Sequence, residues 1–346
     1  MMRAPESGVV SAAVRGWLAG QGYGAVTDAA PPERLSGGAD FWVYGLRFAG
    51  PGLPPRWSAP LVARIPAAAE RYDMLRQESA VQSWAAARGY PAPQVLTVLV
   101  AGEALPSPVQ VMARVPGVPL IAAARGKRFT GLMVRMGAAH AELHRLGSPP
   151  ADARPGTVPD NWLRLARHLT QSGGCGQLAA SLRKIELVQD RLEVADPVVC
   201  HGDFHPLNVL APPGGSALHV IDWTNAGVGD RHGDIAWTLL WFEIAAVAAP
   251  RPAQRVLMRV LRRRLQRAYL TGYRRVLPVD RERVQLWRPV SLLEIWSAAE
   301  ASQRGFFGSE PRLPAGLIRW AVREFHRAAP ALISKSLHRR LGLPHR

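Results

Sequence analysis

The chain has little of several features that define common protein classes. Its 346 residues include two cysteines, Cys175 and Cys200, too few for a disulfide framework or a zinc site. No run of about 18 apolar residues occurs, so no membrane span is expected. The first apolar run is short and is broken by Arg15, which is a poor secretory signal and favours a first helix. Together these absences predict a cytoplasmic location.

Acidic residues and lysine are also scarce, although the net charge is high. The 43 Lys and Arg residues exceed the 26 Asp and Glu residues, giving a formal net charge of +17, and only Lys127, Lys184 and Lys335 are lysines. Arginine is spread along many expected helices, and its densest stretch is residues 262–275. Such a spread is typical of GC-rich codon usage and solvated helix faces. Nucleic acid is therefore not expected as a partner.

Several catalytic motifs are missing as well. The chain has no G-x-x-x-x-G-K-[ST] loop, which would cradle phosphates, and no G-x-S-x-G turn, which would present a nucleophilic serine. Cys200 lies in an apolar run, where a thiol is usually inert. Nucleophilic Ser or Cys catalysis is thus disfavoured.

What is present predicts an α+β chain in two parts. Short apolar runs bounded by Gly and Pro indicate strands of an antiparallel sheet at residues 40–50, 59–66, 94–102 and 107–115. Helical periodicity marks residues 69–89, 130–146, 162–170, 177–194 and much of the chain from 233 onward. We therefore expect a small sheet-rich lobe at residues 1–115 and a larger, mainly helical lobe at residues 116–346.

An island of polar residues interrupts the helical part at residues 198–230. Asp203 follows a strand-like run, Asn208 lies five residues later, and Asp222 follows a further strand. Asp and Asn oxygens suit Mg²⁺, and a separate carboxylate can orient and deprotonate a hydroxyl. The D-x-x-x-x-N spacing is that of a kinase catalytic loop. The island thus predicts phosphoryl transfer.

The island resembles the aminoglycoside phosphotransferase and choline kinase-like family, which has the protein-kinase-like fold. "HGDFHPLNVL" is similar to its H-G-D-x-H-x-x-N loop, and "VIDWTNAGVGDRHGDIAW" to its metal-binding segment and the G-D-x-x-x-D-L-A stretch. The resemblance implies that Asp203 is the catalytic base and that Asn208 and Asp222 hold Mg²⁺. It also implies supporting roles for His201, His205 and Asp234, the last as a helix cap that ties the loop backbone.

The first lobe carries further parts of the same resemblance. "RLSGGADFWVYGL" is similar to the family's phosphate-covering turn, with backbone groups of Ser36, Gly37 and Gly38 facing the phosphates. "LVARIP" places Arg64 where the family carries a phosphate-pairing cation, usually lysine, and Glu78 on the next helix is its expected partner. A surface Arg and a surface Glu remain the alternative for this pair.

The segment "VQVMARVPGVPL" resembles the family's hinge between lobes, so backbone groups from Met112 to Arg114 are expected to pair with the nucleotide base. "GAAHAELHRL" resembles a family helix in which His144 is structural. The resemblance implies ATP or GTP and Mg²⁺ as cofactors and a small-molecule hydroxyl as acceptor. Few acids follow Trp241, which disfavours a large polyamine acceptor; Glu294 and Glu300 are the candidate acceptor-binding residues.

Two other functions fit some of the same residues. A two-metal hydrolase could use the cluster of His201, Asp203, His205 and Asp222, but it leaves Asn208 and the glycine-rich turn unexplained. A catalytically inactive kinase-like protein that binds nucleotide or a partner would keep the fold without the reaction. All three residues that the chemistry needs are present, which favours the active phosphotransferase.

Overall fold

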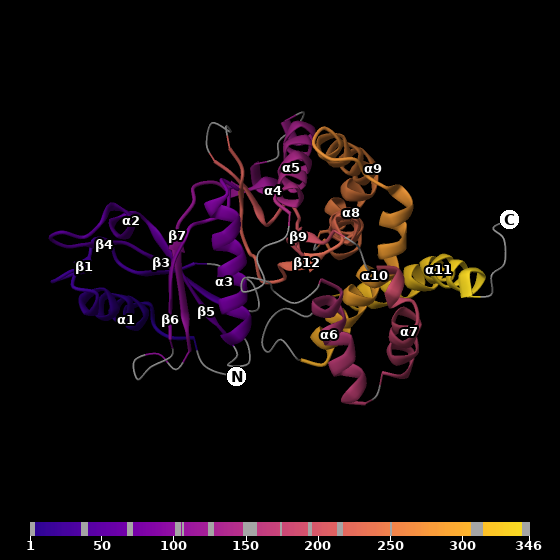
Figure 1. Cartoon of the computed structure of the whole chain (residues 1–346), viewed down its shortest axis with the longest axis horizontal. Helices are drawn as coiled ribbons and strands as arrows, with labels where there is room; N and C mark the ends of the chain where they lie inside the picture. Colours follow the sequence, from indigo (N-terminus) through magenta and orange to yellow (C-terminus); the bar gives the residue numbers. More distant parts are fainter. Residues whose placement is uncertain are drawn as a thin grey trace. The chain divides into compact units, whose positions relative to one another are not determined.

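The computed structural model describes most of the chain, and the statements below concern the described residues. These are residues 4–35, 41–67, 72–100, 105, 107–123, 128–147, 158–173, 175–192, 196–212, 217–249, 251–305 and 314–340. The chain forms two compact units (Figure 1). The first comprises Met1–Gly117 and Ala211–Thr224, and the second comprises Val118–Leu210 and Asn225–Arg346.

The first unit is built on a five-stranded antiparallel sheet in the order β2-β3-β5-β7-β6. Its strands are β2 (Glu33–Leu35), β3 (Phe41–Leu46), β5 (Leu61–Pro66), β6 (Val95–Leu99) and β7 (Val109–Ala113). A smaller antiparallel pair joins β1 (Thr27–Asp28) to β4 (Phe48–Ala49). The helices are α1 (Ser7–Gly20), α2 (Pro55–Ser58) and α3 (Tyr72–Ala87).

Strand β5 shows how the sheet divides its side chains between two faces. Leu61, Ala63 and Ile65 belong to the apolar cluster that also contains the buried side of α1. Because successive side chains on a strand point to opposite faces, Arg64 lies on the other face. There it meets Glu78 of α3.

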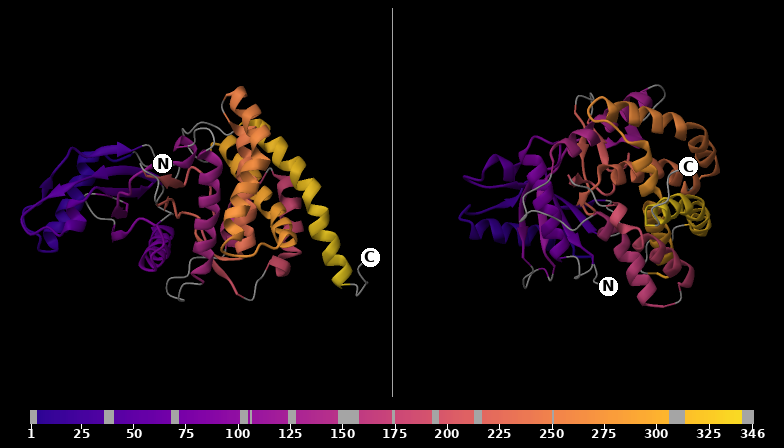
Figure 2. Two further views of the ribbon diagram at one scale, coloured as in Figure 1. Left: turned by 90° about the horizontal axis from the view of Figure 1, so that it is seen from above. Right: turned by 45° about the vertical axis from the view of Figure 1, so that its right-hand side comes forward.

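The second unit is mainly helical (Figures 1 and 2). Its helices are α4 (Leu120–Ala123), α5 (Arg128–Arg145), α6 (Val158–Gln171), α7 (Gly176–Glu186), α8 (Arg231–Ala248), α9 (Pro252–Arg274), α10 (Arg281–Gln303) and α11 (Ala315–Arg340), with a 3₁₀ turn at Gln189–Leu192. Helix α5 packs along α9, and α10 packs against α6, α8 and α11. Strands β9 (Val198–Cys200) and β12 (Gly227–Gly229) form an antiparallel pair. Of the remaining short strands, β8 (Val118–Pro119) belongs to the second unit, β11 (His219–Val220) belongs to the first, and β10 (Val209–Ala211) has residues in both.

The predicted fold class is confirmed, since a small antiparallel sheet precedes a larger helical region. Helix boundaries differ in places. The helix predicted over residues 177–194 ends at Glu186 and gives way to the 3₁₀ turn. Proline residues do not end α10 or α11, which contain Pro289 and Pro330.

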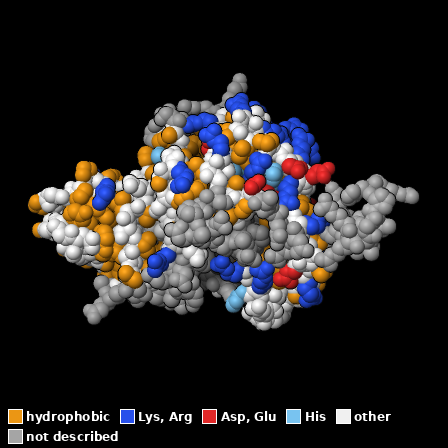
Figure 3. All heavy atoms as spheres, in the orientation of Figure 1, with side chains coloured by type: hydrophobic (Ala, Val, Ile, Leu, Met, Phe, Trp, Pro, Cys, Tyr) orange, Lys and Arg blue, Asp and Glu red, His pale blue; other side chains and the backbone are white. Residues whose placement is uncertain are grey.

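The surface shows the excess of basic residues directly. In the view of Figure 3, Lys and Arg side chains are scattered, with a larger group over α9. Residues 251–275 contain nine arginines and neither Asp nor Glu. No helix among the described residues combines the length and the apolarity that a membrane crossing requires.

Candidate active site

The loop from His201 to Asn208 joins β9 to β10, and its first turn is fixed by Asp234 of α8. The carboxylate accepts the backbone N–H of His201 at 2.6 Å and that of Gly202 at 3.1 Å. Gly202 has a φ of +75°, and a Cβ there would lie 2.1 Å from the carbonyl oxygen of Asn225. This turn therefore requires glycine, which explains the residue before Asp203.

The same loop brings Asp203 and Asn208 together. The Asn208 side-chain amide donates to the backbone carbonyl of Asp203 at 3.0 Å and to its Oδ2 at 3.1 Å. Because the amide nitrogen makes these bonds, the side-chain carbonyl oxygen is the ligand atom that Asn208 can offer to a cation. The Asp203 side chain remains 24% exposed, so a small molecule can reach it.

Asp234 is the centre of a buried polar network. His140 Nε2 lies 2.9 Å from Asp234 Oδ2 and His144 Nε2 lies 3.3 Å from it, while their Nδ1 atoms lie 2.7 Å from the hydroxyls of Tyr269 and Tyr273. Burial opposes ionisation of Asp234, but the hydrogen bonds from the two histidines hold its pKa below the usual range. The loop is thus anchored to an ionised carboxylate in the core of the second unit.

The N-terminus of α8 is capped by a different aspartate from the one predicted. Asp230 is the N-cap residue, and its side chain accepts the backbone N–H of His232 at 2.9 Å. Asp234 lies in the first turn of the helix instead. The cap is held in turn by Arg283 and by the indole N–H of Trp287 at 2.8 Å.

Arg64 is the hub of a polar cluster in the first unit. Its guanidinium donates to Gln110 at 3.1 Å, to Thr224 at 2.8 Å and to Asp222 Oδ1 at 3.3 Å, and it lies 3.8 Å from Glu78. The residue is only 6% exposed, so this is not a surface ion pair. Arg64 holds Asp222 and faces Glu78 at the same time. A lysine could not do both, because its ammonium group lacks the planar fork of donors.

Asp222 has an unusual backbone for its residue type. It is the one non-glycine residue of the described chain with a positive φ, 61°. Its Oδ1 accepts the Thr224 hydroxyl at 2.6 Å, and its side chain is 39% exposed. A left-handed residue held by its surroundings is common at functional sites. A partly exposed, oriented carboxylate fits the requirements of a Mg²⁺ ligand.

The predicted hinge segment uses part of its backbone within the first unit. The N–H of Ala113 donates to Gln94 and that of Arg114 donates to Pro60, both at 2.9 Å. The Arg114 side chain pairs with Glu33 at 2.7 Å, and Met112 is buried beside Gln82. Because these two N–H groups are already bonded within the first unit, the predicted pairing with a nucleotide base is left to the other backbone groups of residues 112–114.

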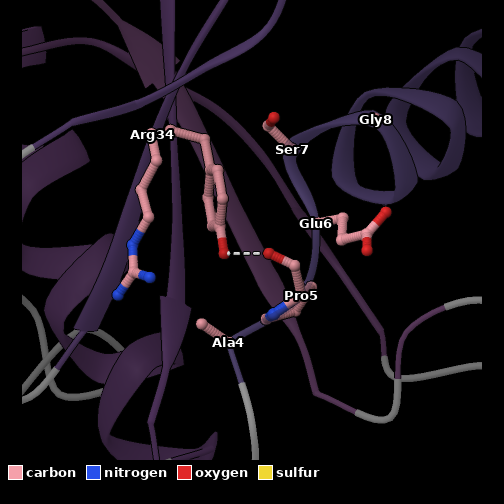
Figure 4. A pocket seen from close by; sticks show the side chains of 7 residues that line it. Ala4, Pro5, Glu6, Ser7, Gly8 and Arg34 are labelled. Carbon is pink, nitrogen blue, oxygen red and sulfur yellow. Dashed lines mark hydrogen bonds between the residues drawn. The ribbon is translucent and has the colours of Figure 1, made fainter.

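Ser36, Gly37 and Gly38 lie outside the described residues. Just before them, Arg34 of β2 lines a pocket with Tyr44 and the start of α1 (Figure 4). The Tyr44 hydroxyl donates to the Pro5 carbonyl at 2.7 Å, which fixes the chain that enters α1. None of the predicted site residues lines this pocket.

The two candidate acceptor-binding acids of α10 have different surroundings. The Oε2 atom of Glu294 is buried without a hydrogen-bond partner among the described residues. Burial, and then the charge of Asp203, raise the pKa of Glu294 to about 8. Glu300 instead accepts from Arg304 at 3.4 Å and faces Cys175. Of the two acids, Glu294 is thus the one whose pKa the charge of Asp203 raises.

The hydrolase alternative finds little geometric support. Among the described residues, the group of three acidic or histidine side chains close enough to share a metal is His140, His144 and Asp234. All three are buried, and hydrogen bonds to tyrosines and to the loop backbone account for their polar atoms. His201 turns its Nδ1 to the backbone N–H of Asp203 at 3.3 Å. Buried Cys200 is no nucleophile either, since burial raises its pKa well above the usual value.

Sequence reasoning missed several residues of these clusters. For His140, Tyr269 and Tyr273 the sequence does contain a signal. His140 precedes His144 by four residues, about one helical turn, and Tyr269 precedes Tyr273 by the same spacing, so each pair is expected on one face of its helix. Gln110 and Thr224 carried no signal. Their contacts with Arg64 join positions 46 and 160 residues apart in the chain.

Residues 32–279 match the family described as the phosphotransferase enzyme family. The chain belongs to this family. It is also 50% identical over 60 residues to an aminoglycoside 3'-phosphotransferase from Streptomyces fradiae, a match that covers 17% of this chain and only 22% of that protein. The resemblance predicted from the catalytic-loop motif is confirmed.

Solved structures of kinases share the fold across most of their length. An ethanolamine kinase from Plasmodium vivax aligns with a TM-score of 0.59 and 12% identity, covering 90% of this chain and 85% of that chain. An amicoumacin kinase in complex with AMP-PNP and Ca²⁺ aligns with a TM-score of 0.59 and 13% identity, covering 95% and 96%. At these identities the likeness establishes the kinase-like fold and leaves the substrate open.

Proposed function

We propose that the protein transfers the γ-phosphoryl group of a nucleoside triphosphate, ATP or GTP, to a hydroxyl of a small molecule. The observation that carries this proposal is the loop in which Asp234 holds the backbone before Asp203, while Asn208 binds the Asp203 side chain. It occurs within the segment that matches the phosphotransferase family.

In this reaction the acceptor hydroxyl oxygen forms a bond to the γ-phosphorus as the bond to the β,γ-bridging oxygen breaks. The hydroxyl proton passes to the Asp203 carboxylate, and the nucleoside diphosphate leaves. Asn208 and Asp222 would hold Mg²⁺, which when bound neutralises charge on the phosphates. Arg64, with Glu78 opposite, orients Asp222 and adds positive charge beside the nucleotide.

The acceptor is proposed to be a compact hydroxyl compound. Of the two candidate acids we favour Glu294 as the acceptor-binding residue, because its buried Oε2 has no hydrogen-bond partner among the described residues, and because burial and then the charge of Asp203 raise its pKa. With a pKa of about 8 it is mostly protonated at neutral pH, and it can then donate a hydrogen bond to the acceptor. The ethanolamine kinase and the amicoumacin kinase suggest ethanolamine, other amino alcohols and amicoumacin for the first panel of acceptors.

The test compares the wild type with Asp203→Asn on that panel. Asp203→Asn should lower phosphoryl transfer at least about a thousandfold, because the proton acceptor is lost. It should leave the affinity for Mg²⁺-nucleotide within a few fold, measured by calorimetry. A folded wild type that binds no nucleotide would favour the inactive alternative, and equal loss of binding and turnover in the variant would count against Asp203 as the base.

A further inference from the structure

Side chains on one face of α8 contact successive residues of the catalytic loop, residues 201–208. Asp234 accepts hydrogen bonds from the backbone N–H groups of His201 and Gly202, and the Thr238 hydroxyl donates to the carbonyl of Phe204 at 2.8 Å. Between them on the same face, the indole N–H of Trp237 donates to Asp203 Oδ1 at 2.9 Å. One turn later the ring of Trp241 stacks on His205, with centroids 5.1 Å apart. Trp237 is the member of this face that contacts the reactive side chain itself.

The polar contacts of Asp203 are divided unevenly between its two oxygens. His205 Nδ1 accepts the backbone N–H of Leu207 at 3.3 Å, and its Nε2 lies 3.2 Å from Asp203 Oδ1. Oδ1 therefore has two polar neighbours, the indole N–H of Trp237, which donates to it, and the ring nitrogen of His205. Oδ2 has one among the described residues, the Asn208 amide, which donates at 3.1 Å. Since each carboxylate oxygen has about two acceptor positions, Oδ2 keeps one open.

We propose that Trp237 is a positioning residue for Asp203, whose indole N–H holds Oδ1 and so directs Oδ2 to the acceptor hydroxyl. This inference rests on the proposed function, because it assigns the proton acceptor to one oxygen of that base.

The chemistry of the indole suits this role. An indole N–H donates and cannot accept, so it cannot take the hydroxyl proton in place of Asp203. A hydrogen bond to an ionised carboxylate is stronger than one between neutral groups, so it fixes the carboxylate plane. Without this donor the carboxylate can rotate, and a displacement on the order of 1 Å in a reacting group can cost up to about a hundredfold in rate.

The kinetic test is Trp237→Phe, which keeps an aromatic ring and removes the N–H. The kcat should fall about tenfold, while KM for the nucleotide and the acceptor stays within about twofold, because a positioning contact acts on the chemical step. The matched control is Trp17→Phe in α1, a helix that carries none of the site residues, and it should leave kcat unchanged. Thermal melts of both variants show whether they fold.

The contact itself is tested by NMR, without any substrate. The chain has 11 tryptophans, and in a ¹⁵N-indole spectrum the peak lost in Trp237→Phe identifies Trp237. That peak should move upfield in Asp203→Ala, which removes the acceptor, and should stay in place in Trp17→Phe.

Three results would overturn the proposal. The first is an unchanged kcat in folded Trp237→Phe. The second is a raised KM for the acceptor with a normal kcat, which would mean that Trp237 contacts the acceptor instead of positioning Asp203. The third is an indole peak whose position does not change in Asp203→Ala. Because the spectrum needs no turnover, the indole peak still tests the contact between Trp237 and Asp203 if the proposed function is wrong. An active wild type with an unmoved peak would reject the positioning role alone.

Discussion

Single residues in the two units carry roles that depend on the shape of their hydrogen-bonding groups. Arg64 is the strongest case in the first unit, because its guanidinium reaches Gln110, Thr224 and Asp222 at once and stacks 4.0 Å from the ring of Phe41. An ammonium group has the same charge but not the planar fork. Arginine at position 64, where the family usually has lysine, therefore allows one side chain to bond all three partners in this chain.

Arg64→Lys should weaken nucleotide use although the charge is kept. The lost hydrogen bonds to Asp222 and Thr224 leave the proposed metal ligand less fixed, and a charged hydrogen bond contributes roughly 1.5–3 kcal/mol. We expect kcat/KM for the nucleotide to fall at least about tenfold. Arg47→Lys, an exposed change in the same unit, is the control and should have no effect. Equal kinetics in both variants would show that only the charge of Arg64 matters.

At this scale the sequence predicted residue types better than contacts. Asp203 and Asn208 were predictable as neighbours, because five residues of one loop separate them and the glycine before Asp203 marks a tight turn. The link from Arg64 to Asp222 spans 158 residues. No local pattern encodes such a distance, since it depends on how two segments meet in the folded unit.

Among the elements, α5 and α9 show how close packing depends on glycine. A Cβ on Gly137 of α5 would lie 1.9 Å from the carbonyl oxygen of Tyr269, and one on Gly272 of α9 would lie 1.7 Å from that of Val134. The helices therefore touch backbone to backbone, which places Tyr269 and Tyr273 against the histidines that hold Asp234.

Gly137→Ala should destabilise the second unit by about 3 kcal/mol, because the methyl group meets backbone that cannot move aside. Gly131→Ala is the matched control on the same helix, with nothing within 4 Å of the new Cβ. It should stabilise by about 0.5–1 kcal/mol, since alanine is the better helix residue. Urea unfolding followed by circular dichroism measures both, and a similar sign for the two would contradict the packing argument.

Element types were predictable from periodicity, whereas element ends were not. Helix α3 was expected over residues 69–89, close to its observed span, because apolar spacing and Gly89 define it. The start of α8 was misassigned, since Asp230 and Asp234 are both plausible caps in sequence. Which one caps is decided by Arg283 and Trp287, side chains from α10 that no local pattern relates to α8.

In the whole molecule, the predicted site residues divide between two units. Arg64, Glu78 and Asp222 belong to the first, and Asp203 and Asn208 belong to the second. Asp222 joins the first unit although it lies more than a hundred residues beyond the predicted boundary at 115/116. A chain that returns to its first unit after entering the second cannot be recognised from composition, because the returning segment is only fourteen residues long.

The buried histidines give the molecule a stability that depends on pH. Burial, and then the neighbouring His140, lower the pKa of His144 to about 4, against the opposing effect of its hydrogen bond to Asp234. Burial lowers the pKa of His140 as well, although Asp234 opposes it. Both rings are therefore neutral in the folded state at neutral pH. Below about 6.5 the unfolded chain takes up protons at these positions and the folded chain does not.

The free energy of unfolding should therefore fall as pH drops from about 6.5 towards 4, since the unfolded state then binds more protons. For His144 alone the loss between pH 7 and pH 5 is about 2 kcal/mol. Urea unfolding at both pH values tests this. His144→Gln, which does not titrate, should flatten the dependence. His326→Gln, a change to an exposed histidine of α11, should preserve it. A wild type equally stable at pH 7 and pH 5 would mean that the network around Asp234 accepts protons while folded, contrary to its burial.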